Sequence, residues 1–389
     1  MGKIKNIGLL ISLLLFLYLL NPYSINFLFG YLLVVIVISK KTFLLKNVDK
    51  NFLLLLVFSF TYAMFYAFKP SGGFQYVFVY ALFPSSFYLL GKYIFIKLEQ
   101  DSSSIYYFLF LLGAVYSLTP LISVLLNIAE GGFGQIDRSL PLFWDGRILT
   151  ATIMGSFFAF NMCIPALLIV KKSGRNIFFT AGAVLVFLLS LACVLRIGSR
   201  TQLAVFLITL LCSLVYIMPR QSIRRNLVIF ALFFGTLSYI ISNVSFDLDQ
   251  DWLSTFASRM ENNGEGDIAS GGGRTQRWVK SFENLFAKPL GWDEKEFGHS
   301  HNMWLDVLRV AGVIPFFLLL LFTLNSFIQI KSALSQVKTN YAFNSQLLIY
   351  GLAFFLVFMV EPVFEGLFTL FAIFCLFMGI VNKYRTMQP

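Results

Sequence analysis

The sequence contains little charge. Of its 389 residues, only 13% are Asp, Glu, Lys or Arg, whereas 58% are hydrophobic and the mean hydropathy is +0.78. Soluble globular domains carry charge on about a quarter of their residues. The composition therefore excludes a soluble globule and predicts an all-α polytopic membrane protein.

Cysteine and histidine are also scarce. The four cysteines all fall inside apolar runs, so we expect free thiols rather than a disulfide framework or a zinc site. The sequence has no Walker loop, Rossmann fingerprint, Ser-His-Asp order signal or His-Glu-x-x-His motif, and no inverted repeat of the kind seen in transporters. We therefore expect neither a cofactor nor a metal.

The apolar stretches predict about twelve transmembrane helices, because a helix needs about 20 residues to cross a bilayer. They lie near residues 5–20, 24–39, 51–68, 76–96, 105–128, 148–170, 177–195, 201–218, 226–243, 302–328, 344–360 and 366–382. The chain thus divides into residues 1–243 with nine spans, a large extracytoplasmic loop at 244–301, and residues 302–389 with three spans. The first span shows no cleavage pattern and is expected to stay uncleaved.

The distribution of charge gives the orientation. With both termini in the cytoplasm, 18 of the 30 basic residues fall on the cytoplasmic side together with only three acidic residues. The net charge is then +15 inside and −4 outside, as the positive-inside rule requires. The formal charge of +11 is thus a signal of membrane topology, and a nucleic-acid partner is not implied.

Arginine is concentrated on the outer side, where the map places eight arginines but only four lysines. The guanidinium group binds phosphate through a planar fork, whereas lysine offers a point charge. The pattern favours an anionic ligand at the outer membrane boundary. For any single arginine, pairing with one of the outer acidic residues is the simpler explanation.

Residues 270–315 form a polar segment among apolar neighbours and contain both histidines, His299 and His301. Apolar residues at i, i+4, i+7 and i+8 predict an amphipathic helix from Thr275 to Ala287, lying on the membrane surface. The other long outer loop, residues 129–147, is rich in glycine and suits either a substrate-facing lid or a plain connector.

Several polar groups are candidates for chemistry. His301-Asn302 begins an apolar helix, where N–H groups favour an anion, but a capping role explains it equally well. Arg196 and Arg200 flank a tight turn, and Arg196 is expected to snorkel toward the lipid surface. The acidic residues Asp247, Asp249 and Asp251 suit a solvated helix entry better than a metal site. Glu361 and Glu365 are either a buried base or an outer turn.

Three pieces of the second half of the chain together resemble the bacterial superfamily of O-antigen polymerases (Wzy-type) and O-antigen ligases. The pieces are Gly198-Ser199-Arg200, then Gly273-Arg274 with Trp278 and Pro289-Leu290-Gly291, and then His301-Asn302 with Gly312. Pro315 departs from the ligase pattern, which usually has a glycine or another small or polar residue there. The first half of the chain agrees with the superfamily only in hydropathy.

The resemblance implies a GT-C-like glycosyltransferase of the cytoplasmic (inner) membrane, with its active site on the periplasmic or outer face. The implied substrate is an oligosaccharide on undecaprenyl pyrophosphate, and a chain-length regulator is a further implied partner. Arg200 and Arg274 would bind the pyrophosphate. His301 would accept the proton of the acceptor hydroxyl, as a base with an ordinary pKa near 6.5, or would assist the leaving group. The implied substrate-binding residues are Arg277, Asn302, Arg196, His299 and Trp278.

Three functions are consistent with these residues. The first is a polymerase that joins the repeat units of O-antigen or capsule into a chain. The second is a ligase that transfers the finished chain to lipid A-core or another acceptor. The third is a flippase of lipid-linked sugars, which we rank below the enzymes because its charges would be expected inside the spans.

Overall fold

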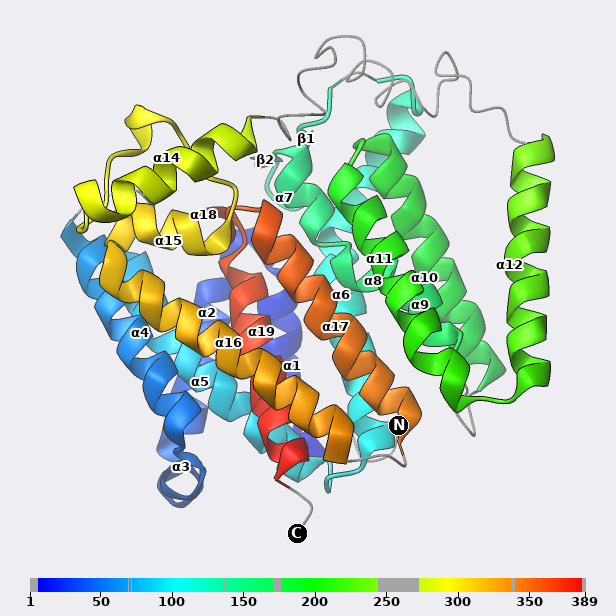
Figure 1. Ribbon diagram of the computed structural model, residues 1–389. Coiled ribbons are helices and arrows are strands. Elements are labelled where there is room, and N and C mark those ends of the chain that lie inside the picture. The colour runs from blue at the N-terminus through cyan, green and yellow to red at the C-terminus, as the bar shows by residue number, and fades with distance from the viewer. Residues whose placement is uncertain are drawn as a thin grey trace. The chain divides into compact units, whose positions relative to one another are not determined.

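The structure is a computed structural model that describes residues 6–68, 70, 72–135, 137–170, 176–243, 273–336 and 340–386 (Figure 1). Among these residues, eight helices are long and apolar enough to cross a membrane, or nine if the bent pair α2 (Asn26–Ser39) and α3 (Lys41–Asn47) is one span. The only strands in the described residues are two short segments. The prediction of an all-α polytopic membrane protein is therefore confirmed, whereas the count of twelve stays a prediction.

The chain divides into two compact units. Unit 1 comprises residues 1–115, 267–338 and 354–389, and unit 2 comprises residues 116–266 and 339–353. Helices α6 (Ser102–Gly131) and α17 (Tyr341–Val360) each contribute to both units.

Unit 1 is built around α5 (Gln75–Lys97) and α19 (Phe368–Arg385), most of whose residues are buried. Two glycines let their backbones meet, because a Cβ on Gly91 would strike the carbonyl of Leu376 and a Cβ on Gly379 would strike that of Tyr88. Besides α2 and α3, the other elements of unit 1 are α1 (Leu9–Leu20), η2 (Pro22–Ser24), α4 (Lys50–Phe68), α14 (Arg274–Ala287), η5 (Glu294–Glu296), α15 (Met303–Ala311), α16 (Val313–Gln336) and α18 (Val363–Gly366).

Unit 2 packs α10 (Ile177–Arg196) and α11 (Arg200–Ile217) against three short helices. These are α7 (Ala151–Ser156), α8 (Ala159–Met162) and α9 (Ile164–Leu168), and they replace the single span predicted at 148–170. The remaining elements are η3 (Met218–Arg220), α12 (Ile223–Asn243) and the antiparallel strands β1 (Leu140–Pro141) and β2 (Ile148–Leu149), which form a hairpin around residues 142–147.

The span predicted at 302–328 is also divided, because α15 ends at Gly312 and α16 begins after it. Gly312 has a φ of +78°, and Gly291 in the Pro289-Leu290-Gly291 turn has a φ of +97°. The turn and the break interlock: Trp292 N donates to Arg309 O at 2.9 Å, and Val313 N donates to Pro289 O at 2.8 Å. Since a Cβ on either glycine would overlap a backbone oxygen, both positions require glycine.

The amphipathic helix predicted at Thr275–Ala287 is present as α14, one residue longer at its start. Gly273 precedes it in the left-handed conformation, and Lys288 follows it as the C-cap. Phe282 and Phe286 lie on its exposed side, and Phe286 is 86% exposed. Figure 1 shows α14 lying across α15 at one end of unit 1.

Candidate functional site

The loop that carries His301 is fixed from both sides by one carboxylate. Asp306, which is 1% exposed, accepts from Ser300 N at 2.7 Å and from Asn302 N at 3.2 Å. Between these two anchors, His301 has a φ of +51°, a conformation that non-glycine residues adopt rarely. Asn302 then caps α15 by accepting from Leu305 N at 3.2 Å. A strained backbone held by two buried hydrogen bonds places the imidazole ring.

Helix α14 supports the same loop. Arg277 Nη1 donates to the carbonyl of His299 at 3.1 Å, and Trp278 Nε1 donates to that of Ser300 at 2.9 Å. The hydroxyls of Ser281 and Ser300 are 2.8 Å apart. Arg277 and Trp278, which the resemblance assigned to substrate binding, therefore hold the backbone beside His301.

His301 has an electrostatic environment that keeps its imidazole neutral. Burial, followed by the positive charges of Arg274 and Arg277, lowers the pKa of His301 to about 4. The proton-acceptor role was predicted from the sequence with an ordinary pKa of about 6.5 for His301. The structure corrects this value, because the environment of the ring lowers the pKa. Within the described residues, Nδ1 of His301 is buried and has no hydrogen-bond partner. At neutral pH the ring is therefore uncharged.

A second cluster surrounds His299. Its Nδ1 lies 2.5 Å from Glu365 Oε2, its Nε2 lies 3.1 Å from Glu294 Oε1, and Arg309 forms an ion pair with Glu365. The hydrogen bond to Glu365 raises the pKa of His299. Burial alone would raise the pKa of Glu365, but His299 and Arg309 together lower it. At neutral pH Glu365 is therefore a carboxylate.

His299, Asp306 and Glu365 also have the donor types of a metal site, with ligand atoms within 4.8 Å of one another. Burial, followed by the charge of Glu365, raises the pKa of Asp306 to about 6. However, Arg309 already neutralises Glu365, and both oxygens of Asp306 accept from backbone N–H groups. These residues fit an internal ion-pair network that orients the His301 loop better than they fit a cation.

The remaining predicted site residues lie in unit 2. Arg200 is exposed and is the first residue of α11. Arg196 is 0% exposed, and its Nη2 donates to Gln135 Oε1 at 3.0 Å, so the prediction that it snorkels is wrong. Arg138 Nε and Nη2 donate to the carbonyls of Ile197 and Gly198 and thereby fix the turn before Arg200.

Unit 1 thus brings together six of the eight predicted site residues: His299, His301, Asn302, Arg274, Arg277 and Trp278. Arg196 and Arg200 belong to unit 2. The acidic residues Asp247, Asp249 and Asp251 lie outside the described residues. Glu361 is 1% exposed in unit 1, and Glu365, four residues further along the chain, contacts His299.

The roles of Asp306 and Arg309 were not predicted from the sequence. The signal was present: two charged residues three apart on an apolar helix lie on the same face and must find partners there. Their partners, the Ser300 backbone and Glu365, could not be read from the sequence, because Glu365 is 56 residues away from Arg309.

No protein-family profile matches this chain, and a search of curated proteins found no match either.

Removal of the Asp306 carboxylate is expected to destabilise the protein. Asp306→Asn replaces one acceptor oxygen with a donor, and each buried N–H left without a partner costs about 1–3 kcal/mol. Asp306→Ala leaves both N–H groups without a partner and should cost more. Thermal unfolding of the purified protein in detergent measures the difference. Asp293→Asn, at an exposed turn, is the control, and an Asp306→Asn variant that unfolds with this control would refute the clamp.

Proposed function

We propose that this protein is a polysaccharide polymerase, a glycosyltransferase that joins undecaprenyl-pyrophosphate-linked repeat units of O-antigen or capsule. The observation that carries the proposal is the neutral imidazole of His301, held in a strained loop beside Arg274 and Arg277. This combination supplies a proton acceptor and cationic groups for an anionic leaving group at one end of a bundle of apolar helices. The proposed location is the outer face of the inner membrane, with both termini in the cytoplasm.

In the proposed reaction, the hydroxyl oxygen of the acceptor sugar attacks C1 of the donor sugar. The C1–O bond to the pyrophosphate breaks, and undecaprenyl pyrophosphate leaves with the electron pair. His301 accepts the proton of the hydroxyl, as a general base positioned near its substrate does. Arginine side chains neutralise the charge that develops on the leaving pyrophosphate.

The electrostatics of the site couple binding to catalysis. In the free protein, Arg274 and Arg277 help to hold the pKa of His301 at about 4. A bound pyrophosphate would offset these positive charges, and the pKa of His301 would rise. The imidazole would then become a stronger base only when the donor is in place.

The two proposed pyrophosphate-binding residues share a local setting. Arg200 is the first residue of α11 and Arg274 is the first residue of α14. The N–H groups and the dipole at a helix N-terminus favour an anion, and a guanidinium group beside them adds a fork for phosphate oxygens. Each arginine can therefore contribute to binding a phosphate group without a metal.

The proposal predicts that purified protein and a single lipid-linked repeat unit suffice to form a ladder of polymers. A gel that resolves chain length reports the reaction. A product that appears only after lipid A-core is added would indicate a ligase instead. Movement of the lipid-linked unit across vesicles without a ladder would indicate a flippase.

The same reaction is expected to continue in the presence of a chelator, because arginines rather than a divalent cation neutralise the pyrophosphate. The comparison is the rate of ladder formation with EDTA and with added Mg²⁺ or Mn²⁺. Activity that disappears with EDTA and returns with the metal would contradict the proposed neutralisation. The candidate metal ligands would then be the cluster of His299, Asp306 and Glu365 and the acidic residues 247, 249 and 251.

A further inference from the structure

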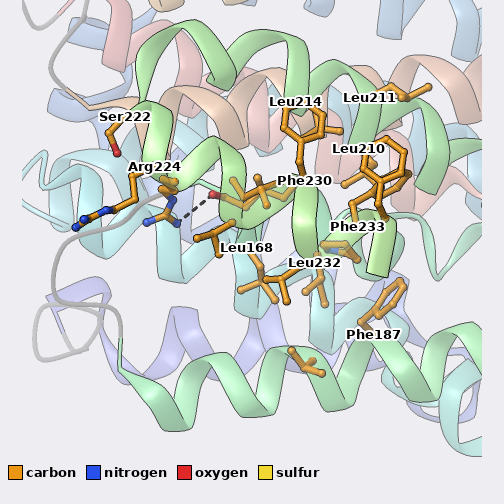
Figure 2. Close-up of a pocket in the computed structure, with 18 residues that line it drawn as sticks. Leu168, Phe187, Leu210, Leu211, Leu214, Ser222, Arg224, Phe230, Leu232 and Phe233 are labelled. Atoms are coloured by element: carbon orange, nitrogen blue, oxygen red, sulfur yellow. Dashed lines mark hydrogen bonds between the residues drawn. The ribbon is translucent and has the colours of Figure 1, made fainter. Parts of the chain in front are cut away.

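Unit 2 contains a large apolar cavity between α9, α10, α11 and α12 (Figure 2). Its volume is about 1090 Å³, and its walls include Phe187, Leu211 and Phe233. This volume slightly exceeds the range of about 300–1,000 Å³ that is typical of small-molecule sites. Water gains few hydrogen bonds from such walls, so the cavity suits a hydrocarbon ligand.

One end of the cavity is polar and basic. Ser222, Arg224 and Arg225 line it there, and Figure 2 shows Ser222 and Arg224 together at the end away from Phe187. Arg225 Nη2 donates to Ile169 O at 3.1 Å, which ties the start of α12 to the end of α9. The cavity lining thus combines apolar walls with two arginine residues at one end.

The two arginines lie in the first turn of α12, which begins at Ile223. A helix N-terminus carries partial positive charge, so cations are unfavourable there and an anion is stabilised. A negatively charged group near Arg224 and Arg225 would therefore relieve this repulsion and receive hydrogen bonds from both side chains. The charge of the cavity end is complementary to a phosphate.

We infer that this cavity binds an anionic phospholipid, with its acyl chains along the apolar walls and its phosphate at Ser222, Arg224 and Arg225. The site is separate from the proposed catalytic chemistry. Within unit 2, Arg200 and the cavity's basic end lie at opposite ends of α11, whose 18 residues span about 27 Å. On the proposed topology, the phosphate lies at the cytoplasmic leaflet. The inference does not depend on the proposed function.

The test is a titration of the full-length purified protein with phosphatidylglycerol or with phosphatidylcholine of the same acyl chains, followed by native mass spectrometry. Wild-type protein is expected to bind phosphatidylglycerol more tightly. A basic residue contributes about fivefold to the affinity for an anionic lipid. Arg224→Gln and Arg225→Gln should each weaken phosphatidylglycerol binding about fivefold, and the double variant about 25-fold. Binding of phosphatidylcholine should change little.

Two controls separate the site from general surface charge and from general hydrophobicity. Arg220→Gln removes a charge at the same end of unit 2, but the Arg220 guanidinium lies over the ring of Tyr216 and does not line the cavity. Leu211→Trp places a larger side chain on the cavity wall, where the acyl chains would lie, and should weaken both lipids. Val215→Trp, at a position on α11 that is 74% exposed and not on the cavity wall, should weaken neither.

Three outcomes would overturn the inference. The first is that wild-type protein binds both lipids equally. The second is that Arg220→Gln weakens the binding of phosphatidylglycerol as much as Arg224→Gln does. The third is that Leu211→Trp binds both lipids as Val215→Trp does. The last measurement is a competition with inorganic phosphate. If it displaces phosphatidylglycerol at millimolar concentration, the arginines form a site for free phosphate instead of a lipid site.

Discussion

Replacement of His301 with alanine is expected to slow ladder formation by about a hundredfold or more, because it removes the general base. Binding of the lipid-linked donor should stay nearly unchanged, since the pyrophosphate is assigned to arginines. The two measurements are the rate of polymerisation and the dissociation constant of the donor, with membrane levels checked by blot. The His301→Ala variant is therefore expected to have a lower kcat.

Lys295→Ala is the control for this variant, because Lys295 is exposed in η5 and has no assigned role. His299→Ala is a second comparison. It removes one partner of Glu365 but leaves the imidazole of His301 in place, so it should slow the reaction less. If the His301→Ala variant polymerises at the wild-type rate, the base lies elsewhere, and the buried carboxyl of Glu361 becomes the next candidate.

The dependence on pH provides an independent measurement of the same group. The ratio kcat/KM reports ionisations of the free protein, in which the pKa of His301 is about 4. A base is active when deprotonated, so the ionisation of His301 itself should lower kcat/KM only as the pH approaches 4, below the pKa of about 6 at which Asp306 takes up a proton. The constant kcat reports the donor complex, where the pyrophosphate raises the pKa. It should therefore fall at a higher pH than kcat/KM does.

The sequence was a good guide to what depends on neighbouring residues. The period of apolar positions predicted α14 to within one residue. This is a local pattern, because a helix face is set by residues a few positions apart. The break at Gly312 was missed because the apolar run continues through it, and only the contact with Pro289 fixes it.

The electrostatics of the site depend instead on contacts between distant residues. The prediction that His301 has an ordinary pKa was wrong because burial and two arginines on α14 act on it, and neither effect can be read from the His301-Asn302 motif. In the same way, Arg309 was counted only as an outer arginine, although its partner Glu365 lies beyond α17. The charge state of an ionisable side chain depends on its burial and on its charged neighbours. Neither can be derived from sequence spacing when the neighbours lie far apart in the chain.

Replacement of Arg274 or Arg200 with lysine tests the other half of the proposed mechanism. Lysine keeps the charge but loses the planar fork, so the variants should still be damaged if each arginine holds a phosphate through paired hydrogen bonds. Loss of such a contact in the transition state removes roughly 2 to 4 kcal/mol, which corresponds to about thirtyfold to a thousandfold in rate. The measurement is ladder formation together with donor binding for each variant.

Arg147→Lys is the matched control, because Arg147 is an exposed outer-loop arginine in unit 2 with no assigned contact to the substrate. If the site requires only a positive charge, Arg200→Lys and Arg274→Lys will be as active as this control. The proposed binding of phosphate through a planar fork would then be wrong. Damage at Arg274 with normal activity at Arg200 would mean that only Arg274 holds a phosphate. Damage at both positions is the expected result, because each arginine begins a helix and the N–H groups at a helix N-terminus favour an anion.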